Sequence, residues 1–305
     1  MTGEVTTGKI WSLVKKSIGS WSHDHASSMG GALAYYTLLS IAPILVIVIA
    51  VAGFFLGDEA ARREIMAQVR GMLGDDGAAA VQGLLKRASE PTQGLIATIS
   101  GIALLIIGAT TVFAELQADL DRIWRAPATT IGGLWALLRA RLLSFGMILA
   151  MGFLLLVSLV VSSALAALGK WWGGWFEGWA LLLEALNFTV SFAVTTTLFA
   201  VMYKMLPRAD IAWRDVWIGA VVTAALFTVG KLLIGLYMGR RGVASGFGAA
   251  GSFTVLLFWV YYSAQSFFLG AEFTWVYANE VGSRAGKSRE KPAPPKPRDR
   301  HPART

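Results

Sequence analysis

Six long apolar stretches constrain the fold of this 305-residue chain more than any other feature. Each holds about 20 residues or more, which lets an α-helix cross a hydrocarbon core about 30 Å thick. Only helices and closed barrels satisfy their backbone hydrogen bonds in that medium, and the alternating pattern of barrel strands is absent. The stretches are Gly31–Gly57, Gln93–Phe113, Leu142–Leu168, Ala180–Tyr203, Val216–Met238 and Ser252–Ala278. The sequence therefore predicts an all-α, polytopic membrane bundle with six transmembrane helices.

The composition agrees with an integral membrane protein. Charged residues make up 15% of the chain and hydrophobic residues 55%, whereas soluble domains hold about 25% charged residues. The 12 Trp and 33 Gly suit a bilayer, where Trp gathers at the interfaces and Gly lets helices approach closely. The chain has no Cys, which excludes disulfides, thiolate metal sites and cysteine nucleophiles.

The distribution of Lys and Arg predicts the orientation. The N-terminal segment, the 114–141 and 204–215 loops and the tail together hold 18 of them, and the 58–92, 169–179 and 239–249 loops hold 8. The positive-inside rule places the richer set in the cytoplasm, so both termini are predicted to be cytoplasmic. The 58–92 loop runs against the rule, because it carries five of the eight outer cations.

Three regions are predicted along the chain. Residues 1–30 hold an amphipathic helix, with Ile10 and Ile18 on its apolar side, that lies on the inner leaflet or packs on the bundle. Residues 31–281 form the transmembrane domain. Residues 282–305 form a basic, proline-rich tail that cannot bury a core and is predicted to be disordered. The tail is expected to be solvated, with binding to anionic lipid or nucleic acid as the alternative.

The 58–92 segment is predicted to form a helical cap on the outer face. Two short amphipathic helices are expected there, separated by Gly74-Asp75-Asp76-Gly77 and ending before Pro91. Such helices need an apolar partner, so they are placed against the outer mouth of the bundle. The cap either acts as a lid or packs there without moving.

Two ionisable residues interrupt the fourth and fifth apolar stretches at matching depth. Lys231 is expected about 10 Å below the outer surface, and Glu184 lies a similar distance below the outer end of its own stretch. Charges are costly at that depth and usually face the protein interior. Glu184 and Lys231 are therefore predicted either to join two helices as an ion pair or to line a substrate site. In the second case, Arg240 and Arg241 would help to draw in an anionic headgroup or carboxylate.

The 242–252 segment after these cations is rich in glycine. Membrane proteins tolerate irregular backbone only where it is packed in protein or lines a wet cavity. Gly246, Gly248 and Gly251 are therefore predicted to allow the backbone to approach a ligand closely. The alternative is a plain surface turn.

Glu115 and Glu272 lie near the predicted cytoplasmic ends of the second and sixth stretches. A coupling or gating role is the specific prediction for them. Charges at helix ends more often anchor a helix at the interface, which is the alternative.

The sequence does not predict an enzyme. The chain has three His, of which His23 and His25 flank Asp24, and zinc needs three or four ligands fixed in space. The zinc-protease, nucleophile-elbow and P-loop motifs are absent. No catalytic residue, metal site or cofactor is therefore predicted.

Several stretches, taken together and in order, resemble the YihY/virulence factor BrkB family of bacterial inner-membrane proteins. The resemblance covers about residues 10–280, and where the family often has Leu-Asn this chain has Leu120-Asp121. The stretches are Gly31–Ser40 with Pro43, Asp121–Trp124, Tyr203–Pro207, Trp213–Val216, Tyr237–Arg240, Gly248–Ser252 and Gly270–Phe273.

This resemblance implies six spans, two cytoplasmic termini and a place in the inner membrane. It also implies an old label, ribonuclease BN, which three scattered His do not support, because a hydrolytic nuclease would need a metal cluster. The leading expectation is transport or handling of an anionic lipid or amphiphile of the envelope, with membrane lipids as partners. The alternative is a scaffold that binds an envelope protein or a second copy of itself. Nucleic acid is not expected as a partner.

Overall fold

The computed structural model describes residues 7–88, 95–126, 146, 149–150, 152–154, 157, 179–240 and 251–285. Every regular element in these residues is an α-helix, which confirms the predicted all-α fold for this part of the chain. The helices are α1 (Thr7–His23), α2 (Ala26–Leu56), α3 (Asp58–Ala88), α4 (Leu95–Ile123), α6 (Trp179–Met205), α7 (Trp213–Arg240) and α8 (Gly251–Glu280).

Four of these helices contain a segment long and apolar enough to cross a membrane. The segments are Ala26–Phe54, Leu182–Met205, Trp213–Ile234 and Thr254–Glu280. They correspond to the first, fourth, fifth and sixth predicted spans. Residues 95–113 of the second predicted span lie within α4, and most of the third lies outside the described residues.

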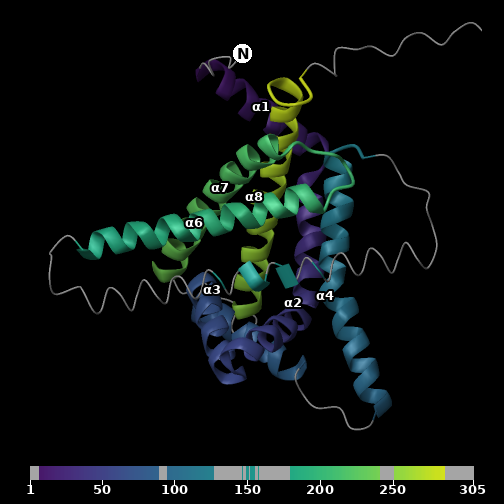
Figure 1. Ribbon diagram of the computed structural model, residues 1–305, viewed down its shortest axis with the longest axis vertical. Helices are drawn as coiled ribbons and strands as arrows, with labels where there is room; N and C mark the ends of the chain where they lie inside the picture. The colour runs from purple at the N-terminus through teal and green to yellow at the C-terminus, as the bar shows by residue number, and fades with distance from the viewer. Residues whose placement is uncertain are drawn as a thin grey trace, which may run out of the picture.

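The long helices fall into two groups (Figure 1). Helices α2, α4 and α8 run alongside one another, and α6 and α7 lean away from them obliquely. Helix α1 and residues 281–285 lie at one end of the bundle, which we call the terminal end. Helix α3 lies at the opposite end, which we call the cap end.

Helix α2 accommodates Pro43 in its interior by packing on α4. Proline removes one backbone hydrogen bond and usually kinks a helix. Here the ring of Pro43 faces Gly108, where an added Cβ would lie 3.0 Å from the proline Cγ. One turn earlier, the Ser40 hydroxyl donates to the Gly108 carbonyl. The small residue on α4 therefore lets the two helices meet at the proline.

Helix α3 is continuous from Asp58 to Ala88, so the predicted break at Gly74–Gly77 is wrong. Each glycine inside a helix costs about 1 kcal/mol relative to alanine, which packing can offset. Val81 is fully buried in a cluster with Ile234 of α7 and with Leu256 and Trp259 of α8. Because this cluster holds the second half of α3, the helix continues through the glycines.

Helix α1 packs on α8 through a face that differs from the predicted apolar stripe. Leu13 and Ser17 are buried, whereas Ile10, Trp11 and Ile18 are exposed. The helix therefore does pack on the bundle. Contact between its exposed apolar side and the membrane surface stays a prediction.

A buried hydroxyl joins α6, α7 and α8 near the terminal end. The Tyr203 hydroxyl donates to the Phe267 carbonyl at 2.7 Å and lies 2.8 Å from the Thr223 hydroxyl. Gly270 leaves room for both side chains, because a Cβ there would overlap Thr223. A buried polar group is costly unless it is hydrogen-bonded, so these bonds specify how the three helices meet.

Candidate functional site: a polar pocket at the terminal end

The chain segments that connect the helices at the terminal end are hydrogen-bonded to one another. Asp121, at the end of α4, accepts from the backbone N–H of Arg208 at 2.7 Å. Asp215, in the first turn of α7, accepts from the hydroxyl of Ser283 at 2.6 Å. Three loops assigned to one side by their cations therefore do meet at one end. Two of the stretches that carry the family resemblance, Asp121–Trp124 and Trp213–Val216, contain the aspartates that accept these hydrogen bonds.

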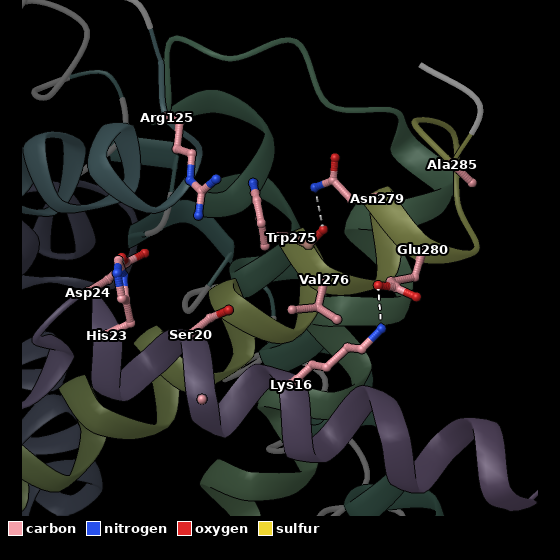
Figure 2. A pocket seen from close by; sticks show the side chains of 11 residues that line it. Lys16, Ser20, His23, Asp24, Arg125, Trp275, Val276, Asn279, Glu280 and Ala285 are labelled. Atoms are coloured by element: carbon pink, nitrogen blue, oxygen red, sulfur yellow. Dashed lines mark hydrogen bonds and ion pairs between the residues drawn. The ribbon is translucent and has the colours of Figure 1, made fainter. Parts of the chain in front are cut away.

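A pocket of about 860 Å³ opens at the same end of the bundle, between α1, α8 and the turn that follows α4 (Figure 2). A volume of this order is typical of small-molecule sites. Charged and aromatic side chains from three separate parts of the chain line it. They include Lys16, His23, Asp24, Arg125, Trp275 and Glu280.

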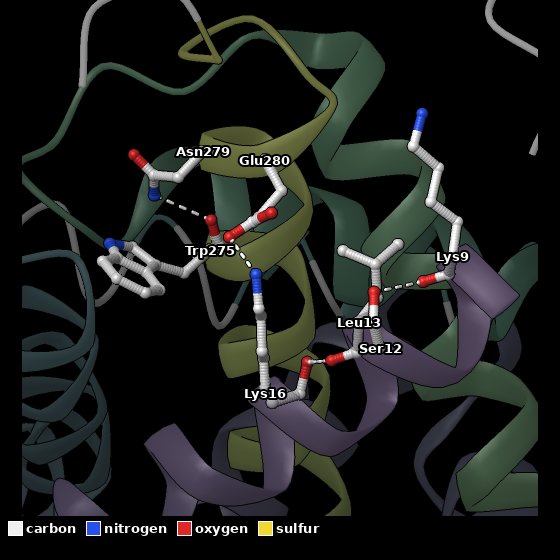
Figure 3. Close-up of polar contacts among 8 residues, drawn as sticks. Lys9, Ser12, Leu13, Lys16, Trp275, Asn279 and Glu280 are labelled. Atoms are coloured by element: carbon white, nitrogen blue, oxygen red, sulfur yellow. Dashed lines mark hydrogen bonds and ion pairs between the residues drawn. The ribbon is translucent and has the colours of Figure 1, made fainter. Parts of the chain in front are cut away.

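Two of the basic side chains that line the pocket already have partners. Lys16 of α1 lies 2.6 Å from the carboxylate of Glu280 on α8 (Figure 3). Nδ1 of His23 lies 2.9 Å from the Asp24 carboxylate. The Lys16–Glu280 pair is half exposed, so water screens it and it contributes little to stability. Its main effect is to set the position of α1 against the last turn of α8.

Arg125 is held differently. It follows α4 with a positive φ of 50°, in the left-handed region that L-residues seldom adopt. This backbone turn directs its guanidinium over the ring of Trp275, 4.6 Å from the ring centre. Within the described residues, no carboxylate lies within ion-pair distance of Arg125.

Glu272 does not line the pocket but lies on α8 about one helical turn before Trp275 and Val276, which do. Its side chain is completely buried. Neither carboxylate oxygen accepts a hydrogen bond from an N–H or hydroxyl donor in the described part of the chain, and the polar side chain next to it is the Asp24 carboxyl. The charged groups that act on Glu272 are the Asp24 carboxyl and, less strongly, Arg125. A buried polar group without a partner is rare and needs an explanation.

Asp24 reaches this position because the chain turns sharply between α1 and α2. His25 takes a left-handed conformation with φ 59°, and its backbone N–H bonds to the Ser22 carbonyl. Asp24 is therefore held in the turn before α2, with its carboxyl next to that of Glu272.

Neither of the two glutamates predicted for coupling or gating lines the pocket, but Glu272 lies next to Asp24 of its lining. Glu115 is partly exposed on α4, one turn before the buried Asp119. Asp119 lies beyond the predicted second span. Burial raises the pKa of Asp119 to about 7, and the negative charge of Glu115 adds to that increase while Arg122 opposes it. The coupling or gating role stays a prediction for both glutamates.

The predicted substrate residues lie elsewhere. Lys231 and Glu184 are both exposed, and no ion pair joins them within the described residues. Helix α7 ends at Arg240 and α8 begins at Gly251, and the side chain of Arg240 is not among those described. The three residues Arg241, Gly246 and Gly248 lie outside the described residues. A substrate site around these residues stays a prediction.

Sequence reasoning missed Asp24 and Arg125 as neighbours of Glu272. In the sequence, Asp24 was considered only as the residue between His23 and His25, in a pattern with too few ligands for zinc. Arg125 directly follows the Asp121–Trp124 stretch. That stretch carried the family resemblance but suggested no chemistry by itself.

Comparison with known proteins gives one family. The family model described as Virulence factor BrkB matches residues 17–295. A UPF0761 membrane protein of Psychrobacter sp. (strain PRwf-1) is 27% identical over 260 residues, which are 85% of this chain and 47% of that protein. A UPF0761 membrane protein of Tolumonas auensis is 28% identical, and the matched region covers 83% of this chain and 80% of that protein. A UPF0761 membrane protein of Cronobacter sakazakii is 26% identical, and the matched region covers 88% of this chain and 89% of that protein. The chain thus spans about half the length of the Psychrobacter relative. No solved structure matches the chain.

Proposed function

Since the chain belongs to the virulence factor BrkB family of membrane proteins, we propose that it binds an anionic lipid or amphiphile and moves it across the bacterial inner membrane. In this proposal both termini are cytoplasmic and the cap end faces outward, as the distribution of cations predicts. The chain acts as a carrier without an enzymatic reaction, and its ligand is the lipid itself.

The position of Lys231 on α7 is the observation that carries this proposal. Its neighbours Val229, Leu232 and Leu233 are more than half exposed, and Lys231 is exposed with them. The apolar stretch on α7 continues to Met238, so Lys231 lies about 10 Å from its end. An ammonium at this depth extends toward the headgroup layer, where a lipid phosphate is the available anion.

The absence of an ion pair with Glu184 in the described structure favours a lipid partner over an internal one. A lysine already neutralised by a carboxylate would have little preference for anionic headgroups. An exposed lysine on an apolar face gains from every phosphate that approaches it. This surface is therefore expected to retain phosphatidylglycerol in preference to phosphatidylcholine.

Two measurements test the proposal: which lipid stays bound to the purified chain, and how fast that lipid crosses a bilayer that contains it. The purified chain, in a mixture of phosphatidylglycerol and phosphatidylcholine, is compared with Lys231→Gln by native mass spectrometry. Proteoliposomes then report the rate at which labelled phosphatidylglycerol crosses the bilayer. We expect Lys231→Gln to lose most of the preference for phosphatidylglycerol and to slow the crossing several-fold. Lys86→Gln, at an exposed lysine of α3, is the matched control and should resemble the wild type.

A scaffold would give a different pattern. The wild-type chain would then move no more lipid than empty liposomes, and it would co-purify with a partner protein or a second copy in fixed ratio. Equal lipid preference in the wild type and in Lys231→Gln would remove Lys231 from the site.

A further inference from the structure

We propose that the pocket at the terminal end binds an amphoteric ligand, a molecule that carries an ammonium group and a phosphate or carboxylate group a few ångströms apart. Asp24, which lines the pocket next to the buried Glu272, receives the ammonium, and Arg125 receives the anion. This site is separate from Lys231 and does not depend on the lipid proposal above.

The acidic side of the pocket needs a cation. Glu272 is completely buried, its two oxygens have no donor within the described residues, and the Asp24 carboxyl is next to it. Two adjacent carboxylates in a buried place cannot both remain charged unless a cation or a proton lies between them. An ammonium bound at Asp24 brings three donors and a full positive charge, and so compensates the negative charge of both carboxylates.

The basic side needs an anion. Lys16 and His23 are engaged with Glu280 and Asp24, which leaves Arg125 as the cation of the pocket lining without an ion-pair partner in the described part of the chain. Its guanidinium is already oriented by stacking on Trp275. A planar guanidinium matches phosphate and carboxylate oxygens two at a time.

Simpler ligands do not match both sides. A lone anion at Arg125 would leave Glu272 without a donor and would face two carboxyls. A lone organic cation would face Arg125. A metal ion needs three or more ligands, and the described residues contain no group of three His, Asp or Glu side chains placed to hold one.

The pocket is also large enough for more than a charged head. Its volume of about 860 Å³ exceeds what two small ionic groups fill, and Trp275, Val276 and Ala285 add apolar wall. The amphoteric group therefore belongs either to a free soluble molecule or to the headgroup of a lipid. The chemistry of recognition is the same in both cases, and the experiment separates the two sources.

The experiment uses the full chain in nanodiscs of phosphatidylglycerol, which carries no amine. Isothermal titration calorimetry compares O-phosphoethanolamine, which joins the two charges, with inorganic phosphate and with ethylammonium. We expect the joined molecule to bind at least tenfold more tightly than either part. Glu272→Gln and Arg125→Gln should each weaken that binding at least tenfold. Glu59→Gln, an exposed glutamate of α3, is the matched control and should bind like the wild type.

A second arm identifies the source of the ligand. Native mass spectrometry compares how much phosphatidylethanolamine and phosphatidylglycerol remain bound to the wild type and to Glu272→Gln. Phosphatidylethanolamine retained by the wild type and lost in the variant assigns the site to a lipid headgroup. Tight binding of the soluble molecule without such retention assigns it to a free ligand. Either result supports an amphoteric site.

Three results would overturn the proposal. One is that the wild type binds neither O-phosphoethanolamine nor phosphatidylethanolamine. Another is that Glu272→Gln and Arg125→Gln bind the joined molecule as well as the wild type does. Neither Glu272 nor Arg125 would then contribute to binding of the ligand. The third is that phosphate alone binds as tightly as the joined molecule. If Glu272→Gln fails to fold, Asp24→Asn replaces it and should show the same loss. Lys231→Gln should leave this binding unchanged, so the two proposals fail separately.

Discussion

Replacing Gly270 with alanine tests the packing of α6, α7 and α8 directly. The added Cβ would overlap Oγ1 of Thr223 and lie 2.7 Å from the Tyr203 hydroxyl. Both neighbours are buried and hydrogen-bonded to each other, so neither moves without cost. One of them must shift, and the hydroxyl pair is then lost.

The magnitude follows from three contributions. Overpacking a core costs about 1–3 kcal/mol, and the lost hydrogen bond costs about 1 kcal/mol. Alanine is better than glycine within a helix by about 1 kcal/mol. We therefore expect Gly270→Ala to destabilise the protein by about 1–3 kcal/mol, which lowers the melting temperature by about 2–12 °C.

Intrinsic tryptophan fluorescence is the suitable assay, because the chain has 12 Trp and no Cys for thiol-reactive dyes. Gly31→Ala on α2 is the matched control, since no atom lies within 4 Å of a Cβ built there. It should melt at or above the wild-type temperature. Removing the clashing Oγ1 by Thr223→Ala should recover part of the stability lost in Gly270→Ala. A melting temperature of Gly270→Ala equal to that of the wild type, with the control behaving as expected, would refute the close contact of the three helices.

Three further predictions follow from the charged groups. In a chain without Cys, Lys86→Cys on α3 should react with an impermeant thiol reagent added to intact cells, and Lys9→Cys on α1 only after permeabilisation; the reverse pattern would invert the orientation. Asp215→Ala should destabilise the protein by about 2 kcal/mol, because the turn after α8 loses two hydrogen bonds to a carboxylate, and proteolysis in that turn should accelerate. Asp119→Asn should raise the melting temperature more at pH 8 than at pH 5. The pKa of Asp119 is raised to about 7, so the wild type loses stability as pH rises from its ordinary pKa toward that value, and the neutral amide avoids the loss; an equal gain at both pH values would contradict this.

Helices are the part of this fold that the sequence predicts well. An apolar run of 20 residues has few alternatives in a bilayer, so the run Ser252–Ala278 is found within α8 with ends shifted by one or two residues. Helix α4 continues ten residues past Phe113, because Leu116, Leu120 and Ile123 extend its buried face beyond the apolar run. The prediction for α3 failed because glycine was weighted as a local break, whereas contacts with α7 and α8 decide its conformation.

The pocket could be predicted only in part. Glu272 was identifiable because an acid within an apolar stretch is costly and needs a reason to be there. Asp24 and Arg125 lie outside the apolar stretches, and each is far from Glu272 in sequence. Two left-handed residues, His25 and Arg125 itself, direct these side chains toward the pocket. Neither is a glycine, so the sequence contains no signal for these turns.

The contact between α1 and α8 has a consequence for biogenesis. Lys16 and Glu280 are 264 residues apart, and ribosomes add about 5–20 residues per second. The buried face of α1, with Leu13 and Ser17, therefore waits on the order of 10–50 s for its partner after it leaves the ribosome. During that interval the nascent chain presents an unprotected helix to chaperones and proteases. Insertion of the last helix is thus the step that completes the packing of the first one.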